Sequence, residues 1–195
     1  MISREPTIER LALAKGLLLT PFGLDETHLA RALGEIKAHQ VDEADLYFQY
    51  TRSEGWSLEE GIVKTGSFSI DQGVGVRAVS GEKTAFAYSD DISEASLLDA
   101  ARTVRTISSA AQKGRTKVAS AKIARARSLY NGVDPISTLD SAAKVALLGK
   151  VAKLARAKDP RVAQVMAGLA SEYDVVLVAR ADGTLAADIR PLVRL

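Results

Sequence analysis

The chain has 195 residues, 47% of them hydrophobic, which is enough to bury the core of one ordinary domain or of two small ones. The formal net charge of +2 neither favours nor opposes a nucleic-acid partner, and the absence of cysteine excludes a disulfide scaffold and any thiolate metal site. No apolar run reaches the roughly 18 residues that a membrane span needs, so we expect no membrane segment and no signal peptide. The absence of cysteine is compatible with the reducing cytosol.

Two helix patterns occupy the first forty residues. An apolar stripe predicts a short helix over 7–15, which Gly16 is placed to end. Asp25 can cap a second helix over 25–38, in which apolar residues recur at three- and four-residue spacing. We therefore expect residues 1–40 to form a helical lead-in to the rest of the domain.

Strand patterns follow over residues 45–88. Apolar and polar residues alternate there, and turn signals at Lys64-Thr65-Gly66 and Ser80-Gly81-Glu82-Lys83 divide the segment. Alternate residues from Val74 to Ala78 share one face of a strand. The segment predicts a meander of four to five strands, of which the last two form a β-hairpin.

The second half of the chain begins with two more helices. The first is expected over 92–110, with Ser93 or Asp91 as its cap. The second is expected over 141–157, with Asp140 as its cap and an inward stripe of apolar residues. The predicted members of that stripe are Val145, Leu148, Val151 and Leu154 or Ala155. Residues 112–130 between these helices form a basic loop.

Three strands are predicted at the end of the chain, over 162–167, 173–179 and 185–195, with a type I′ turn at Asp182-Gly183. Runs of strands separated by runs of helices indicate an α+β fold. We expect an antiparallel sheet, a meander plus C-terminal hairpins, with helices packed on one face. Residues 1–195 are predicted to form a single domain, and the terminal strand stops in mid-pattern, as in a truncated domain.

One motif resembles a nucleotide-binding loop. Residues 73–78 read GVGVRA and match G-x-G-x-x-A, the dinucleotide fingerprint. That fingerprint must open a helix whose N-terminus holds the pyrophosphate, whereas here a hairpin turn and a second strand follow. We therefore expect two glycines that bend a strand or admit a close neighbour.

Metal-ligating and catalytic patterns are sparse. His28 and His39 are eleven positions apart without an H-E-x-x-H spacing, so we expect surface residues and no metal site. Asp90-Asp91 can form an acid pair, although helix capping is the simpler role. Three further strand carboxylates stay open as candidates, and these are Asp45, Asp71 and Asp188. From the residues alone, we predict no catalytic, cofactor-binding or metal-binding residue.

The segment Lys113–Arg127 is the alternative candidate, as a regulatory or nucleic-acid-binding module. It carries six basic residues and no acidic one. It also lacks interleaved aromatic residues for base stacking, so a solvated loop is the reading we prefer.

Three blocks of sequence change this assessment. Residues 45–49 (DLYFQ), 71–88 (DQGVGVRAVSGEKTAFAY) and 182–195 (DGTLAADIRPLVRL) resemble the N-terminal part of members of the TldD/PmbA family, and they occur along the chain in the family's order. Members of this family are zinc metallopeptidases, and older names describe them as modulators of DNA gyrase. The resemblance runs from about residue 40 to the end of the chain.

The resemblance implies a cytoplasmic protease subunit that cleaves unfolded or extended peptides. It implies three kinds of partner: the chain's own C-terminal domain, a PmbA/TldE-type subunit or a second copy, and extended peptide substrates. The family's zinc motif, H-E-x-x-x-H with a further Cys, matches no position here. We therefore expect a non-catalytic N-terminal domain that supports assembly and peptide access, with zinc held in an absent catalytic domain.

Overall fold

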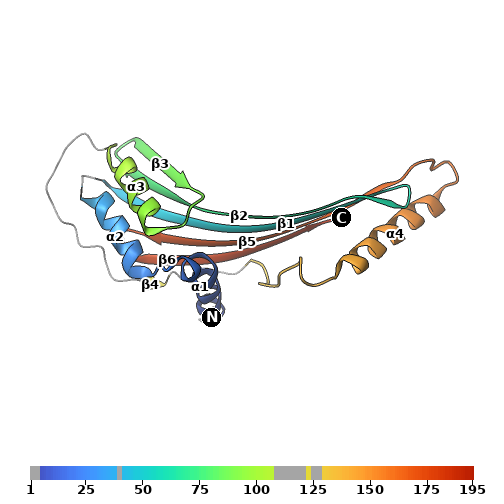
Figure 1. Ribbon diagram of the computed structural model, residues 1–195, viewed down its shortest axis with the longest axis horizontal. Coiled ribbons are helices and arrows are strands. Elements are labelled where there is room, and N and C mark those ends of the chain that lie inside the picture. Colours follow the sequence, from blue (N-terminus) through green and yellow to red (C-terminus); the bar gives the residue numbers. More distant parts are fainter. Residues whose placement is uncertain (1–4, 39–40, 108–121, 124–128) are drawn as a thin grey trace. The chain divides into compact units, whose positions relative to one another are not determined.

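The computed structural model describes residues 5–38, 41–107, 122–123 and 129–195 (Figure 1). The helices are α1 (Glu5–Leu18), the short 3-10 helix η1 (Thr20–Phe22), α2 (Glu26–Lys37), α3 (Glu94–Arg105) and α4 (Ser141–Lys158). The strands are β1 (Glu43–Glu59), β2 (Ile62–Ser80), β3 (Lys83–Ser89), β4 (Lys122–Ile123), β5 (Met166–Arg180) and β6 (Thr184–Arg194).

These strands form one mixed sheet with the order β3-β2-β1-β5-β6-β4. The hairpin strands β2 and β3 pair antiparallel, whereas the short β4 runs parallel to β6. The prediction of an α+β fold with a mostly antiparallel sheet is confirmed. The predicted meander of four to five strands is wrong in number, because β1, β2 and β3 are three strands and the first two are long.

Two compact units divide the chain, and β1, β2, β5 and β6 contribute residues to both. The first unit comprises residues 1–50, 72–129 and 175–188, and the second comprises residues 51–71, 130–174 and 189–195. Whether residues 1–195 act as a single domain stays a prediction.

In the first unit, α2 and α3 pack against each other (Figure 1). Arg31 of α2 lies 2.6 Å from Glu94 of α3, and Arg105 of α3 pairs with Glu35 of α2. Both helices bury an apolar stripe at the 3.6-residue period, and β1 buries alternate residues at its start, at the two-residue period of a strand. The fully buried side chains of this unit include Ile36, Leu46, Phe48, Val76, Leu97, Val104 and Leu177.

The predicted N-terminal caps of the helices are correct, whereas the predicted C-terminal end of α1 is not. Asp25 accepts the Thr27 N–H at 2.8 Å, and Asp140 accepts the Ala143 N–H at 2.7 Å, so both predicted caps are confirmed. Gly16 does not end α1, which continues to Leu18. The buried side chain of Leu18 explains the extension, since its burial outweighs the modest helix penalty of one glycine.

In the second unit, α4 packs on one face of the strands. Its core consists of Leu58, Leu148, Ala152, Val165 and Leu169. Of the predicted inward stripe of α4, Leu148 is buried and Ala155 packs against this core, whereas its alternative Leu154 is 62% exposed. Lys144 and Ala152 are also buried, which the prediction did not include.

The turns required the largest corrections. Lys64-Thr65-Gly66 lies inside β2, and the chain reverses instead at Glu60 and Gly61, whose φ angles are +52° and +79°. This pair of positive φ angles is typical of a type I′ turn. Glu60 is an unusual residue there, but its N–H donates to the Val165 carbonyl at 3.2 Å and its carboxylate accepts the Val165 N–H at 3.1 Å. These contacts are distant in sequence, which is why local turn signals missed them.

The turn at Asp182-Gly183 exists but is of another type. Only Gly183 has positive φ, +84°, and its N–H donates to the Arg180 carbonyl at 2.9 Å. This geometry corresponds to a type I turn ending in a left-handed glycine, a common three-residue hairpin connection. The two strands predicted over 162–167 and 173–179 are in fact one strand, β5, which begins at Met166.

Candidate functional site

The glycines of the G-x-G-x-x-A motif lie in the middle of β2, where Gly75 pairs with Tyr88 of β3 and Gly73 lies just beyond the last pair, Val74 and Ser89. A Cβ atom on Gly73 would lie 2.8 Å from the carbonyl oxygen of Ser89, and one on Gly75 would lie 2.8 Å from the ring of Phe86. No helix begins at this motif, since β2 continues to Ser80. The glycines therefore admit the close approach of β3 and do not form a phosphate-binding loop.

The histidine that the structure describes serves a helix cap. Asp25 accepts the backbone N–H of His28, and the Asp25 N–H donates to His28 Nδ1 at 3.2 Å, which completes a capping box. The hydrogen bond from the His28 backbone is the main cause of the lowered pKa of Asp25. His28 Nε2 lies 3.9 Å from Glu94. His39 lies outside the described residues.

The candidate carboxylates each have separate surroundings. Asp91 accepts hydrogen bonds from the hydroxyls of Ser93 and Ser96, both at 2.6 Å, and these bonds lower its pKa. Ser93 itself is the cap of α3. Asp45 accepts a hydrogen bond from Arg77 at 2.8 Å, and Asp188 lies 4.0 Å from Arg10. Asp71 is exposed on β2, and Asp90 is exposed after β3.

A catalytic zinc site does not fit the residues that the structure describes. Among them, no group of three or more His, Cys, Asp and Glu side chains is arranged to hold a metal ion. A catalytic zinc ion usually takes three protein ligands and keeps one position for water. The one described histidine is engaged in the capping box of α2.

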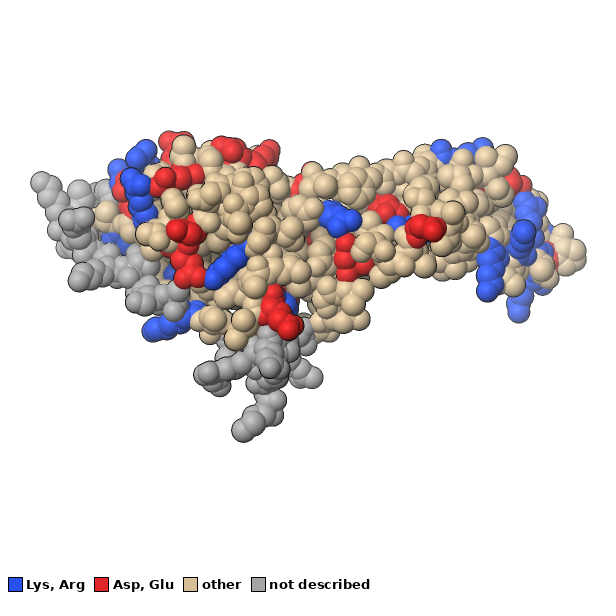
Figure 2. Space-filling model, turned by 60° about the horizontal axis from the view of Figure 1, so that its bottom comes forward, with Lys and Arg blue, Asp and Glu red and all other residues tan. Residues whose placement is uncertain are grey.

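Most of the basic segment 113–127 lies outside the described residues. The exception is β4, whose Lys122 N–H donates to the Gly183 carbonyl at 2.6 Å and aligns β4 with β6. Basic side chains also gather at the end of the second unit where α4 lies (Figure 2). The α4 sequence carries five basic residues and no acidic one, and those in its last turn complement the helix dipole.

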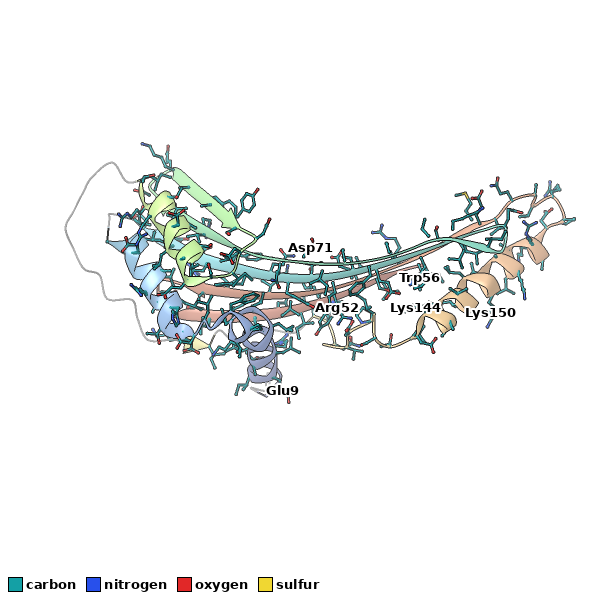
Figure 3. The ribbon with its side chains drawn as sticks, in the orientation of Figure 1. Glu9, Arg52, Trp56, Asp71, Lys144 and Lys150 are labelled. Atoms are coloured by element: carbon teal, nitrogen blue, oxygen red, sulfur yellow. The ribbon has the colours of Figure 1, made fainter. Side chains whose placement is uncertain are left out.

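A buried polar cluster, which sequence reasoning missed, holds α4 on the sheet of the second unit. The Lys144 ammonium lies 2.8 Å from a carboxylate oxygen of Glu54 and donates to the Ile136 carbonyl at 2.7 Å. Trp56 also donates to Glu54 through its indole N–H. Lys144 and Trp56 lie on the side of the sheet on which α4 packs (Figure 3). The signal in the sequence was that Lys144 shares the four-residue spacing of the apolar Leu148 and Ala152.

A second ion pair extends this cluster. Arg52 lies 2.8 Å from Asp134, which also accepts the Ile136 N–H at 2.9 Å. Burial is the main cause of the raised pKa of the nearby Tyr173, and the charge of Asp134 adds to the shift. We call Arg52, Glu54, Asp134 and Lys144 the polar cluster. Its charges pair with one another, so the cluster fixes a helix and a loop and offers no free acid or base.

Residues 62–72 of β2 form the second feature that sequence reasoning missed, and we call them the free edge. Every one of them is exposed, and β3 pairs with β2 only from Val74 onward. Three large apolar side chains of the free edge are more than half exposed: Ile62 at 62%, Phe68 at 56% and Ile70 at 52%. An unpaired edge offers backbone N–H and C=O groups to another strand. The free edge is therefore a part of the described sheet at which a further extended strand could be added.

Two family models match the chain. The PmbA/TldA metallopeptidase domain 1 matches residues 44–110, and the PmbA/TldA metallopeptidase central domain matches residues 134–195.

Among the described residues, no helix has the length and apolar character needed to cross a membrane.

Curated relatives carry the name metalloprotease TldD homolog. The one from Haemophilus influenzae is 47% identical over 91% of this chain and 37% of its own length. One from Buchnera aphidicola is 40% identical over 94% of this chain and 38% of its own length. The chain thus spans little more than a third of the curated relatives that it matches.

Solved structures share the fold at lower identity. A crystal structure described as a modulator of a DNA gyrase, from Thermotoga maritima, is 16% identical with a TM-score of 0.64, over 85% of this chain and 37% of that one. The crystal structure of TldE from Thermococcus kodakarensis is 16% identical with a TM-score of 0.61, over 87% of this chain and 39% of that one. At this identity the likeness concerns the fold.

Proposed function

Because the chain belongs to the PmbA/TldD metallopeptidase family, we propose that it is the N-terminal, non-catalytic part of a TldD-type zinc metalloprotease that cleaves unfolded or extended peptides. The observation that carries the proposal is the pattern of matches. They cover nearly the whole chain but little more than a third of each relative, and the matching models are domain 1 and the central domain.

In this proposal, the catalytic zinc ion is held by residues of the longer protein. Zinc supplies a polarising Lewis acid and an activated water when bound. The residues of this chain supply surfaces, through which the domain supports subunit assembly and peptide access. The partners proposed are its own C-terminal domain and a PmbA/TldE-type subunit, and the lack of cysteine supports a cytoplasmic place for the assembly.

The free edge supports this role physically. Strand addition to an open sheet edge satisfies backbone groups and requires few special side chains. An extended peptide or a partner strand can therefore bind without a pocket. The paired charges of the polar cluster are consistent with this role, since they anchor α4 and the segment around Asp134 to β1, the strand beside β2.

A chimera tests the proposal. We would replace the matching 37% of the Haemophilus influenzae TldD homolog with this chain and assay cleavage of an unfolded protein. We expect the chimera to keep chelator-sensitive cleavage and the same segment deletion to lose it together with normal subunit assembly. Cleavage and assembly that both survive the deletion would show that the segment has neither role.

A further inference from the structure

We propose that the outward face of α4 attracts and binds acidic stretches of unfolded polypeptides. Lys150, Lys153 and Lys158, together with Leu154, make up this face, and we call them the basic face. The inference deepens the function proposed above and rests on it, because it names a substrate class: extended segments rich in Asp and Glu. The surface lies on a helix and is separate from the free edge.

The basic face points away from the core of the second unit. The opposite side of α4 packs against the strands through Leu148 and Ala152. At 3.6 residues per turn, Lys150 and Lys153 lie on the outward side of the helix. All four members of the basic face are exposed, and Leu154 is 62% exposed. Figure 2 shows basic side chains gathered at this end of the second unit.

The charge of the basic face is not neutralised by the surrounding residues. The acidic side chains next to it along the chain are already engaged: Glu60 pairs with Arg156, and Asp159 pairs with Arg161. Within the part of the chain that the structure describes, none of the three lysines of the basic face has a carboxylate within ion-pair distance. Three positive charges are therefore left to interact with a ligand.

The stability of the helix does not account for these lysines. A cation in the last turn complements the helix dipole, which explains Lys158, but Lys150 and Lys153 precede that turn. Residues three apart are neighbours on a helix surface, so these two like charges destabilise α4. Exposed helices commonly place acidic and basic residues at such spacings. The chain thus retains a repulsion that an anionic ligand would relieve.

The residue types favour an unfolded polypeptide over a fixed protein interface. Arg is enriched and Lys is depleted in such interfaces, and the two arginines at this end already have partners. The lysine side chain is a point charge on a flexible stem, whereas arginine is a rigid fork. Lysines can therefore follow acidic residues at varying positions along an extended chain.

Nucleic acid fits the basic face less well. The face has no aromatic side chain on which a base could stack. Its three lysines compare with the roughly six to ten phosphate contacts of a strongly salt-dependent DNA-binding protein. Leu154, which lies among the lysines, offers an apolar contact that a peptide side chain can use and a phosphate backbone cannot. We therefore assign the face to acidic polypeptide.

Fluorescence anisotropy of a short labelled peptide rich in Glu and Ser tests the inference on the 195-residue chain. We expect binding at about 20 mM salt that weakens at least about fivefold at about 150 mM, because salt screens exposed charges. The same peptide with Gln in place of Glu should not bind. Lys150→Glu and Lys153→Glu should each weaken binding about three- to tenfold at low salt. Lys83→Glu, an equal change of charge at an exposed position of the first unit, is the matched control and should have no effect.

Thermal unfolding separates lost recognition from lost folding. Lys150→Glu places an acid three residues before Lys153, so this variant should unfold at the same temperature as the parent chain or higher. A variant that binds less while being no less stable supports a recognition role. If Lys150→Glu fails to fold, Lys150→Gln removes the charge without reversing it and should weaken binding about twofold or more.

Three results would overturn the inference. These are no binding of the acidic peptide at about 20 mM salt, an equal loss in Lys83→Glu, and lysine-dependent binding of duplex DNA that is tighter than peptide binding at about 150 mM salt. The chimera described above separates this inference from the proposed function. An inactive chimera whose segment still binds the peptide through its lysines rejects the protease role alone. An active chimera that cleaves acidic and Gln-substituted unfolded substrates with equal kcat/KM rejects the acidic recognition alone.

Discussion

The ammonium of Lys144 lies between both carboxylate oxygens of Glu54, at 2.8 Å and 2.9 Å, and the Lys144 side chain is only 5% exposed. This pair joins α4 to β1 in a place where apolar side chains otherwise fill the core. Buried ion pairs stabilise little against apolar replacements but cost much when one partner is removed. The pair therefore makes a sharp prediction about stability.

Lys144→Met should lower the free energy of unfolding by about 3–5 kcal/mol, because Glu54 would stay buried without its cation. Urea denaturation followed by circular dichroism measures the loss. Lys150→Met, at an exposed position of the same helix, is the control and should change stability by less than about 0.5 kcal/mol. The double variant Glu54→Gln/Lys144→Met should recover most of the loss. Equal effects of Lys144→Met and Lys150→Met would contradict the role assigned to the pair.

Replacing Gly73 or Gly75 of β2 by alanine should destabilise the chain to different degrees. Gly73→Ala places a Cβ against the backbone oxygen of Ser89, which cannot move without breaking the strand pair. Gly75→Ala places it against the end of the exposed Phe86 side chain, which can turn away. We expect Gly73→Ala to be the more destabilising by about 1 kcal/mol or more.

Gly149→Ala is the matched control for the glycine pair. Nothing lies within 4 Å of where its Cβ would be inside α4, so alanine should stabilise the helix by about 0.5–1 kcal/mol. Thermal unfolding of the three variants gives the order. A Gly73→Ala variant as stable as the parent chain would show that β3 does not approach β2 as closely as described.

Capping and alternation were enough to predict most elements from the sequence. Asp25 and Asp140 mark helix starts correctly, because a cap is a local hydrogen bond between neighbouring residues. The turn predicted at Gly66 is wrong for the opposite reason. It is glycine because the Trp56 ring lies 3.0 Å from where its Cβ would be, which is a contact between strands and not a turn.

The same holds for the candidate sites: features set by neighbouring residues could be predicted, whereas features set by residues far apart in the sequence could not. The failure of the nucleotide motif was predictable, since the sequence after Gly75 continues as a strand. The polar cluster was not, because Arg52, Glu54, Asp134 and Lys144 come together from distant segments. The free edge was missed for a related reason. Strand alternation predicts which face a residue takes, whereas the extent of β3 decides which edge stays unpaired.

The purified 195-residue chain should bind no stoichiometric zinc. Zinc favours nitrogen and sulfur ligands, the chain has no cysteine, and His28 is engaged by Asp25 in the capping box. Metal analysis after dialysis, beside the full-length Haemophilus influenzae TldD homolog, measures this directly. One zinc ion per chain, or cleavage of an unfolded protein that a chelator stops, would mean that the chain holds a metal site of its own.

Glu172 on β5 should make the chain less stable at neutral pH than a neutral side chain would. Burial raises the pKa of Glu172, and the neighbouring Asp174 raises it further by its charge and by a hydrogen bond. Since the pKa of Glu172 is higher in the folded chain than in the unfolded chain, protonation favours folding. Stability from this group is therefore gained as the pH falls through the folded pKa and is absent above it.

Glu172→Gln should accordingly raise the midpoint of thermal unfolding at pH 7, where the parent carries the unfavourable charge. The difference between the two chains should vanish near pH 3.5, below the ordinary glutamate pKa of about 4.3, because Glu172 is then neutral in both states. Glu82→Gln, in the exposed turn between β2 and β3, changes the net charge equally and should show no such gain at pH 7. A Glu172→Gln variant that is less stable at pH 7 would mean that the carboxylate of Glu172 has a favourable partner. A gain that persists unchanged at pH 3.5 would have to arise from packing, since no charge would then remain to be removed.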